Sequence, residues 1–295
     1  MINSNDVSMT LIDKGWSGDK KYCLTDAKGN NYLLRISSEE KYAFLKTMVD
    51  IQQKVTELAV PNPQTIDFGK CDEGVYLVQT WISGGDASDL IPQLSRLEQY
   101  NYGVEAGKIL QKIHSIPASK TQRNWASRFN QKIDRKMMNY NQCAIQFEGA
   151  KHFIHYIESN RYLLADRPQS LQHGDYHIGN MMVENGKIII IDFERYDFGD
   201  PWEEFNRIVW CAQMSPAFAS GMVDGYFNHE VPTLFWRLLA LYISSTALSS
   251  IPWAIPFGDS EVQTMLEQSK EILEWYDNMR NTIPTWYTSG SLFTV

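Results

Sequence analysis

The pattern of apolar and polar positions changes character once along this chain of 295 residues. Residues 7–36 predict a small antiparallel sheet, and the runs at 64–68 and 75–81 predict two further strands joined by a turn. Between these regions, apolar residues recur at helical spacing and predict one main helix. The apolar stripe of that helix consists of Tyr42, Leu45 and Val49.

From Leu97 onward the apolar positions follow the helical period, which predicts a mostly helical second part. Gly84-Gly85-Asp86 separates the two patterns, so we expect two parts, residues 1–83 and 84–295, and an α+β fold class. The segments predicted as helices in the second part are 97–113, 126–138, 143–164, 201–214, 226–227, 233–249 and 260–282.

A polar cluster lies in a Gly-containing loop of the second part. His173, Gly174 and Asp175 precede Asn180, which gives the spacing H-G-D-x-x-x-x-N. The catalytic loop of protein kinases has the related form H-R-D-x-x-x-x-N, in which the Asp orients and deprotonates a hydroxyl and the Asn holds magnesium. The spacing therefore indicates phosphoryl transfer from a nucleotide.

A second Asp follows at the end of a strand of four isoleucines, residues 188–191. Asn185-Gly186 is a strong signal for a two-residue hairpin, which would fold the chain back and bring Asp192 beside Asn180. Magnesium prefers oxygen ligands and takes only a few of them from protein. Asn180 and Asp192 are of the right kind and number for a magnesium site.

The His-Gly-Asp form of the loop resembles that of the aminoglycoside phosphotransferase family and its relatives. Residues 191–204 resemble the family's I-D-F-E…G-D-P-x-x-E/D segment, residues 107–117 its G-x-x-L-x-x-I/L-H-x-I-P helix end, and residues 76–84 its L-V-M-E-W/Y-I-x-G hinge. Four motifs in order, between about residues 15 and 205, are a specific signal. The resemblance implies a two-lobed protein-kinase-like fold, with a nucleotide-binding lobe at 1–83 that ends in the hinge and a catalytic, acceptor-binding lobe at 84–295.

The resemblance also implies an enzyme that transfers phosphate to an alcohol group, with ATP or GTP as co-substrate and Mg²⁺ as cofactor. Asp175 is then the catalytic base, and Asn180 and Asp192 are the metal ligands. Two readings of another class compete. A metal-dependent phosphohydrolase would use His173, Asp175 and His177 as ligands, and a nucleotide-binding pseudokinase would bind ATP without transferring phosphate.

Nucleotide contacts in the first part follow from the same resemblance. Ser17 and Gly18 lie in a Gly- and Ser-containing loop that would cover the phosphates. Arg35 stands where the family commonly has a phosphate-binding Lys, and its permanent charge suits that role. We expect Glu40 to be the acidic partner of Arg35, with Glu39 as the alternative.

The predicted hinge supplies the remaining nucleotide contacts. By similarity to kinases, the Thr80 carbonyl and the Ile82 amide would bond the adenine edge. Backbone groups make these contacts, so side-chain identity does not choose between ATP and GTP.

Charge gives slight support for a cationic acceptor. The net charge is −8; residues 1–83 carry nine basic and 11 acidic residues, and residues 84–295 carry 18 and 24. An acidic second part disfavours nucleic acid and suits a polycation. On the family resemblance, we expect an aminoglycoside-type antibiotic first, and a metabolite of the choline, homoserine, fructosamine or methylthioribose type second. The acidic candidates for acceptor binding are Glu203, Glu204, Glu271, Glu274 and Asp277, followed by Asp197 and Glu148.

The sequence gives weaker evidence on cellular location and on oligomeric state. The four cysteines are scattered without a C-x-x-C pair, which fits a reducing cytoplasm and argues against a zinc site or disulfides. No signal peptide is apparent at the N-terminus. The apolar stretch at 234–255 contains Arg237 and Pro252 and predicts a packed helix rather than a membrane span. Nothing in the sequence indicates an oligomeric state.

Overall fold

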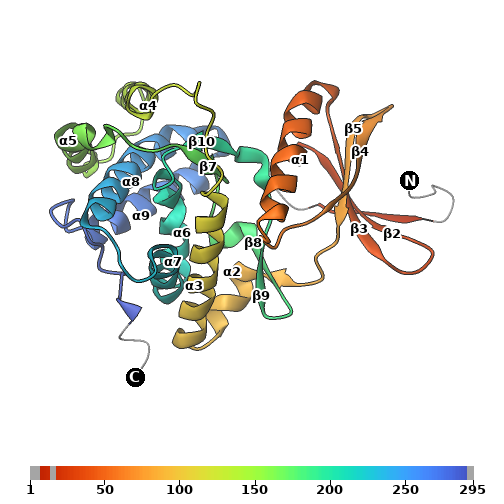
Figure 1. Ribbon diagram of the computed structural model, residues 1–295. Coiled ribbons are helices and arrows are strands. Elements are labelled where there is room, and N and C mark those ends of the chain that lie inside the picture. The colour runs from red at the N-terminus through yellow and green to blue at the C-terminus, as the bar shows by residue number, and fades with distance from the viewer. Residues whose placement is uncertain (1–6, 14–17, 291–295) are drawn as a thin grey trace. The chain divides into compact units, whose positions relative to one another are not determined.

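The computed structural model describes residues 7–13 and 18–290, and the chain forms two compact units (Figure 1). The N-terminal unit comprises Met1–Leu90 and Asn180–Tyr196, and the C-terminal unit comprises Ile91–Gly179 and Asp197–Val295. The α+β class predicted from the sequence is confirmed. The division differs from the predicted boundary after residue 83, because the segment around residues 181–190 pairs with residues 85–86 and so joins the first unit.

The N-terminal unit is built on a five-stranded antiparallel sheet with the order β1-β2-β3-β5-β4. One long helix, α1, lies along this sheet (Figure 1) and buries Leu45, Met48, Ile51, Gln52 and Val55. The helix is tied to the sheet by a buried hydrogen bond of 3.1 Å, in which the Gln79 amide donates to Gln52. The elements are β1 (Ser8–Leu11), β2 (Lys20–Thr25), β3 (Asn31–Ser37), η2 (Glu39–Lys41), α1 (Tyr42–Glu57), β4 (Thr65–Cys71) and β5 (Gly74–Thr80).

A smaller sheet in the same unit has the order β6-β8-β9. Asn185 and Gly186 both have positive φ, 51° and 74°, as a two-residue type I′ turn requires. The hairpin predicted from Asn185-Gly186 is therefore confirmed. Its neighbours are β6 (Gly85–Asp86), α2 (Ala87–Leu90), β8 (Met181–Glu184), β9 (Lys187–Ile190) and η6 (Phe193–Arg195).

The C-terminal unit is mostly helical, as its periodicity predicts, with one small sheet in which β10 pairs with β7. The predicted helix at 143–164 is shorter in the structure, because residues 143–149 form no regular helix before α5 begins. The elements are η3 (Ile91–Gln93), α3 (Arg96–Ile113), α4 (Trp125–Asn141), α5 (Ala150–Asn160), η4 (Arg161–Leu164), β7 (Ser170–Gln172), β10 (Asp197–Gly199), η7 (Glu203–Arg207), α6 (Ile208–Met214), α7 (Pro216–Phe227), α8 (Thr233–Ala254), η8 (Ile255–Phe257) and α9 (Asp259–Trp275). The short turn η5 (Ile178–Asn180) joins the two units in the chain.

Helix α8 is the central helix of this unit and contacts α4, α5, α9 and η7. The stretch Thr233–Phe257 is long and apolar enough to cross a membrane by length and composition, and 67% of its most apolar window is buried within the protein. Such burial is typical of a core helix, which is the structure predicted for residues 234–255.

Helices α3 and α7 lie unusually close along their length, because glycines face each other across the contact. A Cβ added to Gly103 would overlap the carbonyl oxygen of Phe218, and one added to Gly107 would overlap that of Met222. Gly221 and Gly225 of α7 stand in the same relation to the α3 backbone. Two glycines four residues apart on each helix thus set the distance between the helices. The sequence prediction found only the last two residues of α7, because nearly all of its residues are buried and no polar face reveals the period.

Replacing Gly107 by Ala tests this contact. In an exposed helix the change would stabilise the protein by about 1 kcal/mol through helix propensity. Here the added methyl group must push α7 away, so we expect a loss of roughly 2–3 kcal/mol in the free energy of unfolding, measured by urea denaturation. Gly18→Ala is the control, since a Cβ at Gly18 meets no atom within 4 Å. Equal stability of the Gly107→Ala variant and the wild type would contradict the close packing.

Candidate active site

The loop that carries Asp175 follows strand β7 directly. Gly174 has a φ of 85°, in the left-handed region that glycine adopts without strain. His173 is fully buried, and its Nδ1 accepts a 3.3 Å hydrogen bond from the backbone N–H of Asp175. The imidazole therefore shapes the loop from inside.

One buried carboxylate holds the backbone of this loop. The N–H of Gly174 donates to both oxygens of Glu204 at 3.1 Å, and the N–H of Tyr176 donates to Oε1 at 3.2 Å. Only 2% of Glu204 is exposed. On the other side of this carboxylate, Nε2 of the buried His114 lies 3.8 Å from Oε2. Glu204 thus fixes the turn on both sides of Asp175, and is not free to bind a substrate ammonium group.

The electrostatics of Glu204 favour its charged form. Burial by itself would raise the pKa of the carboxyl group, but His114, His173 and the N–H of Gly174 together bring the pKa below its usual value. The predicted role of Glu204 in acceptor binding is replaced by a structural one, namely that of a buried anion that accepts backbone hydrogen bonds.

A second buried carboxylate, Asp200, anchors the segment that leads to Glu204. The Arg167 guanidinium donates to it from Nε and from one terminal nitrogen at 2.7 and 2.9 Å, and the Tyr242 hydroxyl donates at 2.6 Å. Asp200 also accepts the N–H of Trp202 at 3.0 Å, so it caps the turn that follows. Loop and anchor are therefore part of one rigid hydrogen-bonded assembly within the C-terminal unit.

Asp175 itself is accessible, with 17% of its side chain exposed. Nε of Arg207 lies 3.2 Å from Oδ1, and Nε2 of His177 lies 3.8 Å from the same oxygen. The sequence prediction did not single out Arg207. Its position three residues after Glu204, in the same short helix η7, is the signal that could have placed it near the loop.

The N-terminal unit brings the two predicted metal ligands together. The N–H of Ile191 donates to the backbone oxygen of Asn180 at 3.1 Å, and the β8–β9 pairing continues from Met181 opposite Ile190. Asp192 comes directly after this pairing, with φ 64° and ψ 68°, in a left-handed conformation that Asp tolerates better than most residues. The hairpin therefore places Asp192 beside Asn180 along the backbone, as predicted.

The zinc-like arrangement required by the phosphohydrolase reading is absent from the residues that the structure describes. Within 7–13 and 18–290, no three His, Cys, Asp or Glu side chains are grouped so that they could hold a metal ion. His173 is buried beneath the loop and bonded to its backbone. This geometry disfavours His173, Asp175 and His177 as a ligand set.

Arg35 lies in an acidic environment within the N-terminal unit. Its Nε is 2.7 Å from Oδ2 of Asp19, and a terminal nitrogen forms an ion pair with Glu194. Lys41 shares Asp19 at 2.8 Å. Burial raises the pKa of Glu194, with Asp192 and Asp19 adding to the rise and Arg35 opposing it. The guanidinium is thus positioned by two carboxylates, those of Asp19 and Glu194.

The prediction that Glu40 is the acidic partner of Arg35 is wrong. The chain turns through η2 before α1 begins at Tyr42, and this turn leaves Glu40 exposed. The alternative, Glu39, pairs with Lys70 at 2.7 Å on the surface. Asp19 and Glu194 take the place of these residues, and the sequence pattern missed them because both are distant from Arg35 along the chain.

The structure gives little information on the other predicted nucleotide contacts. Ser17 lies outside the described residues, and Gly18 is exposed. The N–H of Thr80 donates to the Gln64 carbonyl at 2.9 Å, at the end of β5. Ile82 follows in an irregular segment, and the next residue, Ser83, donates its N–H to Glu184. The roles of Ser17, Gly18, Thr80 and Ile82 stay predictions.

Removing the charge of Glu204 tests the anchor. Glu204→Gln keeps the shape but cannot accept both N–H groups as a carboxylate does, so we expect a loss of roughly 2–3 kcal/mol of stability near neutral pH. The folded pKa lies below the unfolded value, so this contribution is present above about pH 4.5 and is lost as the pH falls through the folded pKa. Urea denaturation between pH 3 and 7 should show that the free energies of unfolding of the wild type and the variant become similar at acidic pH. Glu230→Gln, at an exposed site, is the control; a constant difference across this range would contradict the role of the charge.

Comparisons with known proteins agree with this geometry. The aminoglycoside phosphotransferase APH(4)-Ia has 18% identity and a TM-score of 0.67, over 92% of this chain and 94% of that chain. A choline/ethanolamine kinase family protein from Mesorhizobium loti has 15% identity and a TM-score of 0.68, over 92% and 91%. APH(2")-IIa, crystallised with streptomycin and ATP, has 15% identity and a TM-score of 0.61, over 89% and 90%. Among curated proteins, none matches the chain in sequence. The profile of the phosphotransferase enzyme family matches residues 8–236, and the chain belongs to that family.

Proposed function

We propose that this protein transfers the γ-phosphoryl group of ATP or GTP to a hydroxyl group of a small molecule. The observation that carries the proposal is the loop at 173–176, whose backbone is fixed by buried Glu204 while Asp175 stays accessible. Asn180 follows five residues after Asp175. Its backbone oxygen accepts a hydrogen bond from the N–H of Ile191, the residue directly before Asp192. A rigid loop with one accessible carboxylate, followed by two oxygen ligands, is the arrangement that phosphoryl transfer needs.

In this proposal, Asp175 accepts a hydrogen bond from the acceptor hydroxyl and orients its oxygen toward the γ-phosphorus. The bond between that phosphorus and the bridging oxygen breaks, a bond to the alcohol oxygen forms, and the alcohol proton passes to Asp175. Arg207, 3.2 Å from Asp175, holds the carboxylate in place. Orientation and charge neutralisation supply most of the acceleration in such reactions.

Asn180 and Asp192 would hold Mg²⁺. The fit rests on their donor atoms, one amide and one carboxylate oxygen, and on the backbone pairing that brings the two residues together. When bound, Mg²⁺ neutralises charge on the β- and γ-phosphate oxygens.

Arg35, Ser17, Gly18, Thr80 and Ile82 are the proposed nucleotide contacts. Asp19 and Glu194 hold the Arg35 guanidinium on two sides. Arg presents five N–H donors, so it can keep these partners and still offer an N–H group to a phosphate oxygen. Related structures support a nucleotide co-substrate, since thermostable mutants of APH(4)-Ia were crystallised with ADP or AMP-PNP, and APH(2")-IIa with ATP.

Two classes of acceptor follow from the comparisons. Structures of APH(4)-Ia with hygromycin B and of APH(2")-IIa with gentamicin support an aminoglycoside, and with it a role in antibiotic resistance. The choline/ethanolamine kinase family neighbour supports a metabolite instead. Three of the acidic candidates in the C-terminal unit have basic partners: Glu203 pairs with Lys132, Asp197 with Arg128, and Asp277 with Arg280. These ion pairs leave less negative charge available for a polycationic acceptor. The scattered free cysteines support a cytoplasmic location.

Removing the proposed base tests transfer directly. Asp175→Asn should lower kcat by roughly 100-fold or more, because the amide orients the hydroxyl poorly and cannot take its proton. Binding of Mg·ATP, measured by isothermal titration, should change little. The readout is ADP release with and without a panel of alcohols, and Asp50→Asn, on the exposed side of α1, is the control. Near-normal turnover would exclude Asp175, and a wild type that binds ATP but never releases ADP would favour the pseudokinase reading.

Asp192→Asn tests the metal site without disturbing the backbone, because Asn also tolerates the left-handed conformation at this position. We expect Mg²⁺ to strengthen ATP binding by the wild type and expect most of this gain, roughly tenfold or about 1.4 kcal/mol, to be lost in the variant. Titrations of ATP with and without Mg²⁺ give the difference, and the same titrations with GTP give the nucleotide preference. An unchanged Mg²⁺ dependence would place the metal elsewhere.

A further inference from the structure

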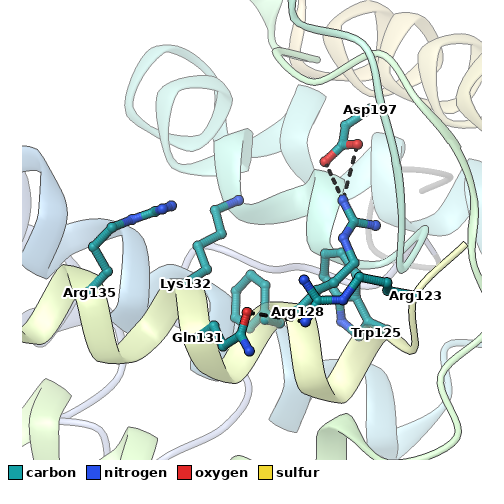
Figure 2. A pocket seen from close by; sticks show the side chains of 8 residues that line it. Arg123, Trp125, Arg128, Gln131, Lys132, Arg135 and Asp197 are labelled. Carbon is teal, nitrogen blue, oxygen red and sulfur yellow. Dashed lines mark hydrogen bonds and ion pairs between the residues drawn. The ribbon is translucent and has the colours of Figure 1, made fainter.

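Helix α4 carries a pocket whose charge is opposite to that expected for a site that binds a polycation. The cavity has a volume of about 340 Å³, within the range of small-molecule sites. Figure 2 shows its lining, with Lys132 and Arg135 rising from the same side of α4 as Arg128. The lining residues are Arg123, Trp125, Arg128, Phe129, Gln131, Lys132, Arg135 and Asp197.

The basic residues of this pocket form a row along the helix. Arg128, Lys132 and Arg135 stand at positions i, i+4 and i+7, so they share one face of α4, and Arg123 precedes the first turn. Trp125 and Phe129 are buried beneath them, with the Arg128 guanidinium 5.6 Å from the Trp125 ring. The pocket therefore combines an aromatic floor with four cationic groups.

The carboxylates nearby do not balance this charge. Arg128 pairs with Asp197 at 3.0 Å, and Lys132 pairs with Glu203 at 3.3 Å. Arg123 donates only to the Gln131 amide oxygen, at 3.4 Å. In the described part of the chain, neither Arg123 nor Arg135 has a carboxylate partner within 4.0 Å. The guanidinium groups of Arg123 and Arg135 are therefore available to bind an anion.

The row continues toward the catalytic loop within the same unit. Lys136, half-buried on the next turn of α4, has a pKa lowered to about 7 by burial and by Lys132, with Arg207 and Arg135 adding to the effect and Glu203 opposing it. Arg207 is the residue that lies 3.2 Å from Asp175. A direct contact also links the pocket to the loop. Lys132 pairs with Glu203 at 3.3 Å, and the other oxygen of Glu203 accepts a 3.2 Å hydrogen bond from Gln172, three residues before Asp175.

We propose that the acceptor alcohol carries an anionic group, a phosphate or a carboxylate, that binds to Arg123, Arg128, Lys132 and Arg135 while its hydroxyl reaches Asp175. The inference rests on the proposed function and narrows its substrate class. Guanidinium groups bind phosphate and carboxylate oxygens through paired N–H donors, and an ammonium group placed here would meet like charges. Arg128 and Arg135, the first and last of the three basic residues on this face of α4, lie seven residues apart, about 10 Å along the helix.

A cationic acceptor has a weaker site. A second cavity, of about 450 Å³, is lined by Lys270, Leu273, Glu274, Asp277 and Asn278. Asp277 already pairs with Arg280 at 2.6 Å, and the lining includes the basic Lys270 as well as the acidic Glu274. This cavity therefore offers little net negative charge.

The test compares alcohols that differ only in an anionic group. Glucose and ribose are neutral, glucose 6-phosphate and ribose 5-phosphate carry phosphate, gluconate carries carboxylate, and kanamycin carries ammonium groups. ADP release in the presence of Mg·ATP is measured for each. We expect kcat/KM for at least one anionic alcohol to exceed that of its neutral counterpart by tenfold or more, and the phosphate and carboxylate arms show which anion is preferred.

The double variant Arg123→Gln/Arg135→Gln removes the two cations that lack carboxylate partners, so it leaves no buried carboxylate unpaired. It should erase the preference for the anionic alcohol, chiefly through KM, and its melting temperature shows whether it is folded. The control is Lys108→Gln/Lys151→Gln, which removes the same charge from exposed positions on α3 and α5 and should keep the preference.

Three outcomes overturn the inference: preference for neutral or cationic alcohols, a preference that survives in the double variant, or no response to any anionic alcohol. If Mg·ATP still binds and any alcohol is phosphorylated, the proposed function stands and only the acceptor class is wrong. If Mg·ATP does not bind, the proposed function itself fails.

Discussion

The site depends on one buried interaction, in which the Glu204 carboxylate accepts the backbone N–H groups of Gly174 and Tyr176. A backbone turn at this position would otherwise leave buried donors without acceptors, which is costly. The carboxylate is itself fixed, because Asp200 anchors the preceding turn through Arg167 and Tyr242. The loop that presents Asp175 is therefore rigid before any ligand arrives, and such preorganisation is what transition-state stabilisation requires.

Local sequence signals predicted much of this arrangement. Asn185-Gly186 specified a hairpin, the hairpin fixed which residue lies beside Asn180, and the H-G-D-x-x-x-x-N spacing identified the loop. Each of these signals acts over a few residues, where backbone preferences dominate. Helices with a clear polar face, such as α3 and α4, were also predicted close to their observed ends.

Interactions between distant residues were not predictable in the same way. The partners of Arg35 come from positions 16 residues before it and 159 residues after it, and no periodic pattern links them. Helix α7 was mostly missed because its buried faces hide the period, and its glycines make sense only opposite α3. The charge of the α4 pocket runs against a net charge of −8, since it depends on which basic residues gather on one face.

The central claim is that this chain forms a phosphate ester on a small-molecule alcohol. The most direct measurement incubates the protein with Mg·ATP and a protein-free extract of cellular metabolites, and identifies by mass spectrometry every compound that gains a phosphoryl group. We expect at least one new phosphate ester, derived from an alcohol that already carries an anionic group, formed together with an equal amount of ADP. Release of ADP matched only by inorganic phosphate, with no new ester, would contradict it.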